Sequence, residues 1–76
     1  MAVTVHVQFN SSAPADFLIE METWLQPYID AGNTFNEFPA PSTGFDFRRE
    51  WDTVENANAF ITKVTSYDIV NFAVIE

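Results

Sequence analysis

The segment FDFRREWDTVENANAF, residues 45–60, contains the two patterns that decide the fold. Apart from Arg49, apolar and charged side chains alternate along its first seven residues, which is the period of a strand with one buried face. Asp52 or Thr53 can cap a helix after this strand, and Asp52 has Glu55 at the spacing of a capping box. The segment therefore predicts a strand over 45–51 and then a helix with an apolar stripe at helical spacing, made of Val54, Ala57, Ile61 and Val64.

The N-terminal part of the chain repeats this combination of a strand and a helix. Apolar residues, mostly valines, alternate with polar residues over 3–9, which predicts a half-buried strand. Apolar side chains between residues 17 and 28 recur at helical spacing, with Ser12 as a candidate N-cap. Pro27 is expected to kink this helix or to end its regular part near residues 24–26, because proline lacks the N–H that the helix needs. Gly32 is the expected stop signal.

Two more strands complete the pattern. Residues 33–38 and 45–51 are separated by the turn-rich PAPSTG, residues 39–44, and so predict a hairpin. Residues 69–75, IVNFAVI, are nearly all apolar, which is typical of a strand covered on both faces, or on one face with a dimer contact on the other. The order β-α-β-β-α-β with right-handed crossovers predicts a ferredoxin-like α+β sandwich, in which a four-stranded antiparallel sheet has two helices on one face. We expect one domain over residues 1–76, with the first and last strands as the central pair.

The charge and residue counts exclude several function classes. The chain of 76 residues has 3 Lys and Arg against 11 Asp and Glu, a formal net charge of -8, which disfavours nucleic acid and anionic membranes as partners. With no cysteine and one histidine, we expect neither a metal site nor a cofactor. No apolar run is long enough to span a membrane and no basic leader opens the chain, so we expect a cytoplasmic protein. A domain this small buries little surface by itself, and self-association is the remaining way to bury more.

A functional site is expected on the face of the sheet that the helices leave open. Alternation directs His6 of the first strand, and Arg48 and Glu50 of the third strand, to this face. Gln8 and Asp46 share it. A carboxylate could orient His6 as a general base, and Arg48 could hold an anion. The competing interpretation is a solvated face with compensating charges, which half-buried strands commonly show.

The other side of the third strand is expected to face the helices. Phe45, Phe47 and Trp51 lie on this side. Arg49 lies there too, and its charge is expected to reach the edge of the sheet, to stack on Trp51 or to pair with an acid such as Glu55. Trp51 is expected to pack in the core, and the alternative is that it borders a ligand pocket.

The run Trp51-x-Thr53-x-Glu55-x-Ala57-x-x-Phe60 resembles the strand-to-helix junction of the dimeric α/β-barrel superfamily, whose best-known branch is the antibiotic-biosynthesis-monooxygenase-like proteins. The predicted order of elements agrees with the fold of that family. The resemblance implies a homodimer whose sheets pack together, with a pocket between each sheet and its helices, and it implies that Trp51 lines this pocket. Family enzymes oxidise polyphenols without a cofactor, degrade haem or rearrange small ring compounds.

Three functions follow as hypotheses. The first is a non-catalytic homodimer that binds a small molecule or a protein, with candidate ligand-binding residues His6, Arg48, Glu50 and Trp51. The second is a cofactor-independent, monooxygenase-like enzyme that acts on a small aromatic compound through His6 or Trp51, although the sequence contains no catalytic motif. The third is an acidic interaction protein, such as a phage protein or a DNA mimic. A cavity of about 300 Å³ or more with convergent polar groups would favour a ligand site, and contiguous carboxylates on one face would favour mimicry.

Overall fold

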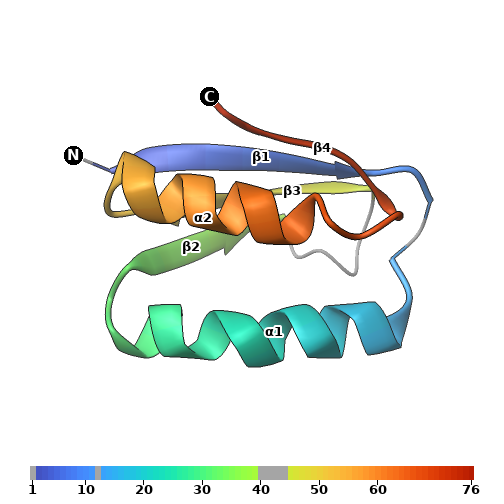
Figure 1. Cartoon of the computed structure of the whole chain (residues 1–76), viewed down its shortest axis with the longest axis horizontal. Coiled ribbons are helices and arrows are strands. Elements are labelled where there is room, and N and C mark those ends of the chain that lie inside the picture. The colour runs from blue at the N-terminus through green and yellow to red at the C-terminus, as the bar shows by residue number, and fades with distance from the viewer. Residues whose placement is uncertain (1, 12, 40–44) are drawn as a thin grey trace.

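The computed structural model describes residues 2–11, 13–39 and 45–76 of the chain. Within these ranges it has four strands and two helices in the order β-α-β-β-α-β (Figure 1). The elements are β1 Val3–Phe9, α1 Ala15–Asp30, β2 Thr34–Phe38, β3 Asp46–Trp51, α2 Val54–Val64 and β4 Val70–Ile75. The ferredoxin-like α+β arrangement predicted from the sequence is therefore confirmed.

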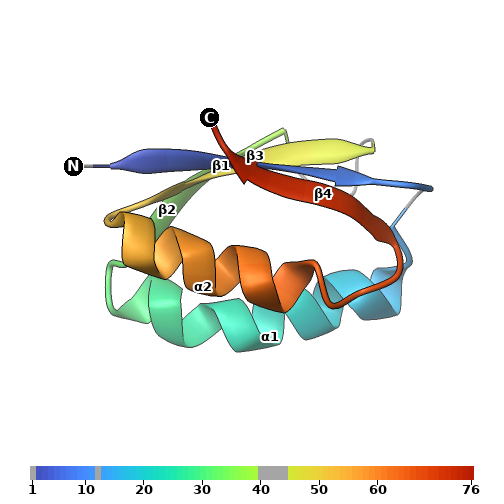
Figure 2. The ribbon, with the colours of Figure 1, turned by 45° about the horizontal axis from the view of Figure 1, so that its top comes forward.

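The strands form one antiparallel sheet in the order β2-β3-β1-β4, and both helices cover the same face of it (Figure 2). The prediction that the first and last strands are the central pair is wrong, because β1 and β3 are central and β4 is an edge strand. Helix α1 joins β1 to β2, and α2 joins β3 to β4; in each unit the two strands are parallel and one strand lies between them. The two β-α-β units interleave, because β3 lies between β1 and β2, and β1 lies between β3 and β4. The last strand must then lie outside β1.

The core lies between the sheet and the helices. The sheet contributes side chains that alternation directs toward the helices, and all of the following are fully buried: Val5 and Val7 of β1, and Phe47 and Trp51 of β3. The helices contribute the residues of their apolar stripes: Phe17, Met21 and Leu25 of α1, and Ala57, Phe60 and Val64 of α2. The predicted periodicities of β1 and α1 therefore agree with the burial. In α2, Ala57 and Val64 are buried as predicted, but Val54, the first residue of the helix, is 50% exposed, and Phe60, beside the predicted stripe, is buried.

Helix α1 continues past its proline. It runs to Asp30, and the carbonyl of Pro27 accepts a hydrogen bond from the N–H of Ala31 at 3.1 Å, so the prediction that the helix ends near residues 24–26 is wrong. Pro27 deprives only the carbonyl of Thr23 of its partner, and both residues are exposed, so water can replace the missing donor. The expected stop at Gly32 is confirmed, since this glycine has φ 76°. The N-cap candidate Ser12 lies outside the described residues.

Helix α2 begins at a hydroxyl cap instead of a capping box. Thr53 Oγ1 accepts a hydrogen bond from the N–H of Asn56 at 3.2 Å. Of the two cap candidates Thr53 is therefore confirmed, and the capping box predicted from the spacing of Asp52 and Glu55 is wrong. The Asp52 carboxylate instead accepts hydrogen bonds from the side-chain amides of Asn56 and Asn33, both at 2.9 Å. These bonds hold the pKa of Asp52 below its usual value, and the bond from Asn56 has the larger effect. They also tie the start of β2 to the junction between β3 and α2.

Two expectations about the strand ends need correction. Strand β3 begins at Asp46, one residue later than predicted, and Phe45 is 58% exposed because it precedes the regular alternation. Strand β4 is not covered on both faces within the chain, since Ala73 is buried while Val74 and Ile75 are exposed. The predicted turn over 39–44 lies outside the described residues apart from Pro39. In the described part of the chain, neither helix is long and apolar enough to cross a membrane.

Candidate functional site

The open face of the sheet brings β1, β3 and β4 together around His6. In the register of the sheet, His6 lies opposite Arg48 on one side and opposite Val74 on the other. Directly opposite residues of antiparallel strands point to the same face. The structure therefore places His6 and Arg48 side by side on this face, as the alternation of the two strands predicted.

His6 is held by two carboxylates. Its Nε2 lies 3.0 Å from Asp46 Oδ2, and its Nδ1 lies 3.7 Å from Glu76 Oε2. Its ring makes an edge-to-face contact with Phe72, with centroids 5.3 Å apart, and only 15% of the side chain is exposed. The compensating charges expected on a solvated face are therefore present, but His6 itself is largely shielded from solvent. The predicted carboxylate partner is present, and it is Asp46.

Arg48 is neutralised by a residue that the sequence interpretation missed. Its Nε and Nη2 donate to the two carboxylate oxygens of Glu76 at 2.7 and 3.3 Å. This bidentate contact raises the pKa of Arg48 and lowers the pKa of Glu76. Glu76 follows Val74 by two residues, so the alternation of β4 could have identified it as a member of the same face. His6, Asp46, Arg48 and Glu76 form one connected group, which we call the polar centre.

The other two candidate residues do not belong to the polar centre. Glu50 lies toward the far end of β3, opposite Thr4 and Phe35, and its carboxylate accepts a hydrogen bond from Asn36 Nδ2 at 3.3 Å. Trp51 points to the helices and is fully buried. The prediction that it borders a ligand pocket finds no support in the three cavities described below, because its ring packs inside the core.

Four apolar side chains flank the polar centre, and we call them the apolar rim: Phe35 and Phe38 of β2, and Phe72 and Val74 of β4. Phe35 and Phe38 reach the same face because a bulge at Asn36, which has φ 51°, shifts the register, so that they lie opposite Glu50 and Arg48. Phe38 and Val74 are 45% and 46% exposed. Simple alternation places Phe35 and Phe38 on opposite faces, so the sequence pattern could not reveal this side of the rim.

Arg49, on the helix side of β3, has a different partner from the one expected. Its Nη1 donates to Glu37 Oε2 on β2 at 3.2 Å, so the pairing with Glu55 is wrong. Glu37 lies opposite Arg49 in the register of neighbouring strands, whereas Glu55 belongs to the first turn of α2. Arg49 is buried on the helix side of the sheet, and Glu37 is partly exposed at the sheet edge. The pair joins β2 to β3.

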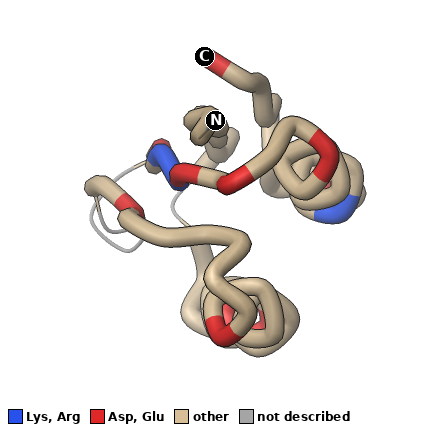
Figure 3. The backbone as a smooth tube through the Cα atoms, turned by 90° about the vertical axis from the view of Figure 1, so that its left-hand side faces the viewer, with Lys and Arg blue, Asp and Glu red and all other residues tan. Residues whose placement is uncertain are grey.

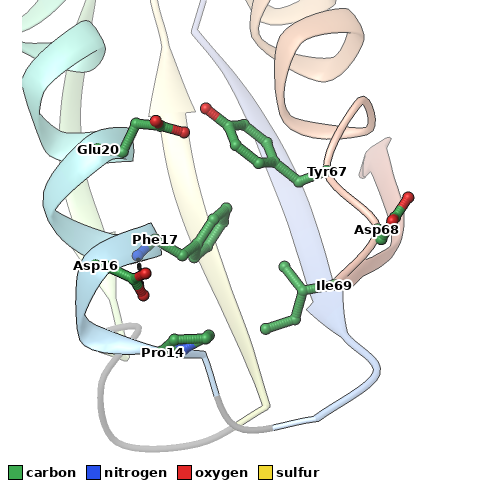
Figure 4. A pocket seen from close by; sticks show the side chains of 7 residues that line it. All are labelled: Pro14, Asp16, Phe17, Glu20, Tyr67, Asp68 and Ile69. Atoms are coloured by element: carbon green, nitrogen blue, oxygen red, sulfur yellow. Dashed lines mark hydrogen bonds between the residues drawn. The ribbon is translucent and has the colours of Figure 1, made fainter.

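One cavity, of about 340 Å³, lies between the start of α1 and the turn that precedes β4 (Figure 4). The rings of Phe17 and Tyr67 meet edge to face with centroids 5.0 Å apart, and the Tyr67 hydroxyl points toward Glu20. That contact raises the pKa of Tyr67, and the hydroxyl also accepts a hydrogen bond from Trp24 Nε1 at 3.0 Å. Asp16 is engaged by the N–H of Phe17 at the helix start. Tyr67 and Asp16, two of the polar residues that line this cavity, are therefore already engaged in contacts within the chain.

Two further cavities border the helices. One, of about 390 Å³, is lined only by side chains of α1 and α2. The other, of about 470 Å³, is a shallow depression on the outer side of α1. None of the three cavities is lined by His6, Arg48, Glu50 or Trp51. Among the described residues, no group of three or more histidines or carboxylates is arranged to hold a metal ion.

Comparisons of the chain with known proteins identified no related protein. No protein-family model, no curated protein and no solved structure matches the chain. The class that the fold defines is the ferredoxin-like α+β sandwich, and the likeness to the dimeric α/β-barrel superfamily rests on the residues quoted from the sequence.

The packing of His6 leads to a stability prediction. His6→Ala should lower the free energy of unfolding by about 1 to 2 kcal/mol, because the variant loses a hydrogen bond to a carboxylate and the contact with Phe72. Urea unfolding followed by circular dichroism measures this change. Gln8→Ala, on the same strand and face, is the matched control and should stay within about 0.5 kcal/mol of the wild type. Equal values for the two variants would show that the polar centre carries no stability.

Proposed function

We propose that the protein is a non-catalytic binding protein that acts as a homodimer, with the open face of the sheet as the contact between two copies. The observation that carries this proposal is the apolar rim. Its side chains lie on both edges of one face, and two of them are nearly half exposed. Exposed apolar side chains that gather on one face of a small protein are typical of an interaction surface.

The polar centre supports a contact role over a catalytic one. A general base or an anion-binding cation has to be free to meet a substrate. Arg48 is instead engaged by both oxygens of Glu76, and both ring nitrogens of His6 face carboxylates, Nε2 that of Asp46 and Nδ1 that of Glu76. Because these charges are already paired within the chain, a partner can cover them without leaving an unpaired charge at the interface.

A second copy of the chain is the partner that this surface suits best. A mimic of DNA needs contiguous carboxylates, but Arg48 lies between Asp46 and Glu50, which are about 13 Å apart along the strand. A two-fold contact needs a self-complementary patch, and apolar side chains at both edges of a polar centre whose members contact one another satisfy this requirement. A chain of this size also has much to gain from burying more apolar surface.

Sedimentation equilibrium tests the proposal. The wild type should have twice the 8.6 kDa mass of the chain at 100 μM or above. The dimer should dissociate less at higher salt, because two copies with a formal net charge of -8 repel each other and salt screens this repulsion. Val74→Asp should weaken the dimer by about 100-fold or more, because it introduces a charge into the apolar contact.

Ile19→Asp is the matched control, because Ile19 is 65% exposed on α1. This variant adds the same charge away from the open face and should leave the dimer constant within about twofold of the wild type, apart from the small general repulsion. A wild-type monomer at 0.5 M salt and the highest soluble concentration would refute the homodimer. Equal weakening by both aspartates would refute the open face as the contact.

A further inference from the structure

We propose that the cavity between α1 and α2 binds a flat aromatic molecule that carries one negative charge, such as an aromatic carboxylate. We call this cavity the helix groove, and its lining residues are Trp24, Tyr28, Ala59, Phe60 and Lys63. Its volume of about 390 Å³ lies within the range of small-molecule sites. It contains no strand residue, so it is separate from the open face on which the proposed dimer contact depends.

Three aromatic rings give the helix groove a shape that suits a flat ring. Trp24 and Phe60 have their centroids 5.9 Å apart and are inclined by 44°. Phe60 forms the buried floor, and it is fixed from below because it stacks on Trp51 with centroids 5.0 Å apart. Tyr28 is held in turn by an edge-to-face contact with Trp51. The aromatic surface is therefore rigid before any ligand binds, which lowers the entropy cost of binding.

Lys63 determines the charge of the ligand. Among the described residues it is the one cation with no carboxylate within ion-pair distance, since Arg48 pairs with Glu76 and Arg49 pairs with Glu37. Lys63 belongs to α2 and the two arginines belong to β3, and the blue segments of these two elements lie apart in Figure 3. Its Nζ lies over the Trp24 ring at 5.7 Å from the centroid, and none of the lining residues is acidic.

The same ammonium group makes a cationic ligand unfavourable. A cation over Trp24 would have to compete with Lys63 for the face of the ring and would be repelled by it. An aromatic anion can instead place its ring against Trp24 and Phe60 and accept a hydrogen bond from Lys63 Nζ in the helix groove. On a chain with 3 cations and 11 acids, this is the position where a small anion meets a free positive charge beside an apolar surface.

Titration with 2-naphthoate, followed by ¹H–¹⁵N NMR, tests the inference. The chain has two tryptophans, so the indole N–H signal of Trp24 reports on the helix groove and that of Trp51 on the core. We expect saturable shifts, largest at Trp24, Ala59 and Lys63, with a dissociation constant below about 1 mM for a ligand of this size. The cationic analogue 2-naphthylmethylammonium should bind at least about fivefold more weakly than 2-naphthoate.

Matched variants separate the charge from the shape of the groove. Lys63→Gln should raise the dissociation constant about fivefold, whereas Arg48→Gln, which removes the same charge from the opposite side of the molecule, should change it by less than about twofold. Ala59→Leu should raise it about tenfold or more by filling the groove, and Asn58→Leu, on the neighbouring residue outside the lining, should leave it unchanged.

Three results would overturn the inference: no saturable shift at millimolar 2-naphthoate, tighter binding of the ammonium analogue, or equal effects of Ala59→Leu and Asn58→Leu. Val74→Asp should bind 2-naphthoate as the wild type does, because the helix groove does not involve the dimer contact. A wild-type monomer that binds 2-naphthoate would refute only the proposed function, and a wild-type dimer that does not bind it would refute only the ligand site.

Discussion

Trp51→Ala is expected to lower the free energy of unfolding by about 3 to 5 kcal/mol, the cost of removing a large aromatic side chain from a packed core. Trp51 is fully buried at the end of β3. It contacts both helices at once, because it stacks on Phe60 of α2 and meets Tyr28 of α1 edge to face. A domain of 76 residues has a total stability of about 4 to 11 kcal/mol. The variant should therefore lose a large part of its stability, as urea unfolding at 25 °C will measure.

Trp51→Phe is the control that separates packing from polar effects. The indole Nε1 is buried and has no hydrogen-bond partner among the described residues. Phenylalanine keeps a ring against Phe60 and removes this unsatisfied donor, so the loss of volume is partly offset and the cost should stay below about 2 kcal/mol. If Trp51→Ala unfolded at the urea concentration of the wild type, Trp51 would not belong to the core, and its role as a pocket residue would return.

Glu37→Ala is expected to cost about 3 kcal/mol, because it leaves the charge of Arg49 buried without its partner. The Arg49 side chain is only 8% exposed, and its Nε has no partner among the described residues. Burial lowers the pKa of Arg49, while the fields of Glu37 and of Glu22 on α1 oppose this change. Glu22 is the remaining acid that can compensate in the variant, so the cost lies at the lower end of the range for broken buried pairs.

Arg49→Met should lower the free energy of unfolding by less than about 1 kcal/mol, so removing the arginine costs less than removing its partner. Glu37 lies on an edge strand and its side chain is 27% exposed, so water still reaches part of the carboxylate when the arginine is absent. The methionine fills the buried space with apolar atoms. In the double variant, Glu37→Ala should therefore add little to Arg49→Met. Additive costs in this double-mutant cycle would show that the two side chains are not coupled.

The same pair has a defined pH dependence. Burial raises the pKa of Glu37, and Arg49 opposes the rise, so Arg49→Met should raise it further. A carboxyl group whose pKa is raised in the folded state contributes stability that is present below its unfolded pKa of 4.5 and is lost as the pH rises through the folded value. The free energy of unfolding of Arg49→Met should therefore fall relative to that of the wild type between pH 4.5 and pH 7. A constant difference over this range would contradict the assignment of Glu37.

The order and kind of the elements could be predicted because they depend on local patterns. The period of two in β1 and β3 and the apolar stripes of α1 and α2 are properties of successive residues. Most of the side chains that they direct inward are buried, and Phe45 and Val54, at the ends of their elements, are exposed. His6 and Arg48 could be assigned to the open face by the same alternation. The helix stop at Gly32 followed from the freedom of glycine to adopt a positive φ.

The strand order and the partners of the charged residues depend on the tertiary structure. Local patterns are the same whether β4 is a central or an edge strand, and the interleaving of two crossovers decided this point. That position brought Glu76 to Arg48 and His6 from 28 and 70 residues away in sequence number. It also left the exposed apolar residues of β4 at an edge, where they can contact another molecule.

Sequence alone determined the elements, the inward faces and the acidity of this protein, because hydrophobic periodicity depends only on neighbouring residues and net charge depends only on composition. Only the tertiary structure decided what each polar side chain meets. The bulge at Asn36 moved Phe35 and Phe38 to one face, register paired Arg49 with Glu37, and the packing of two helices left Lys63 beside three aromatic rings. These are contacts between distant segments, and no local pattern specifies them.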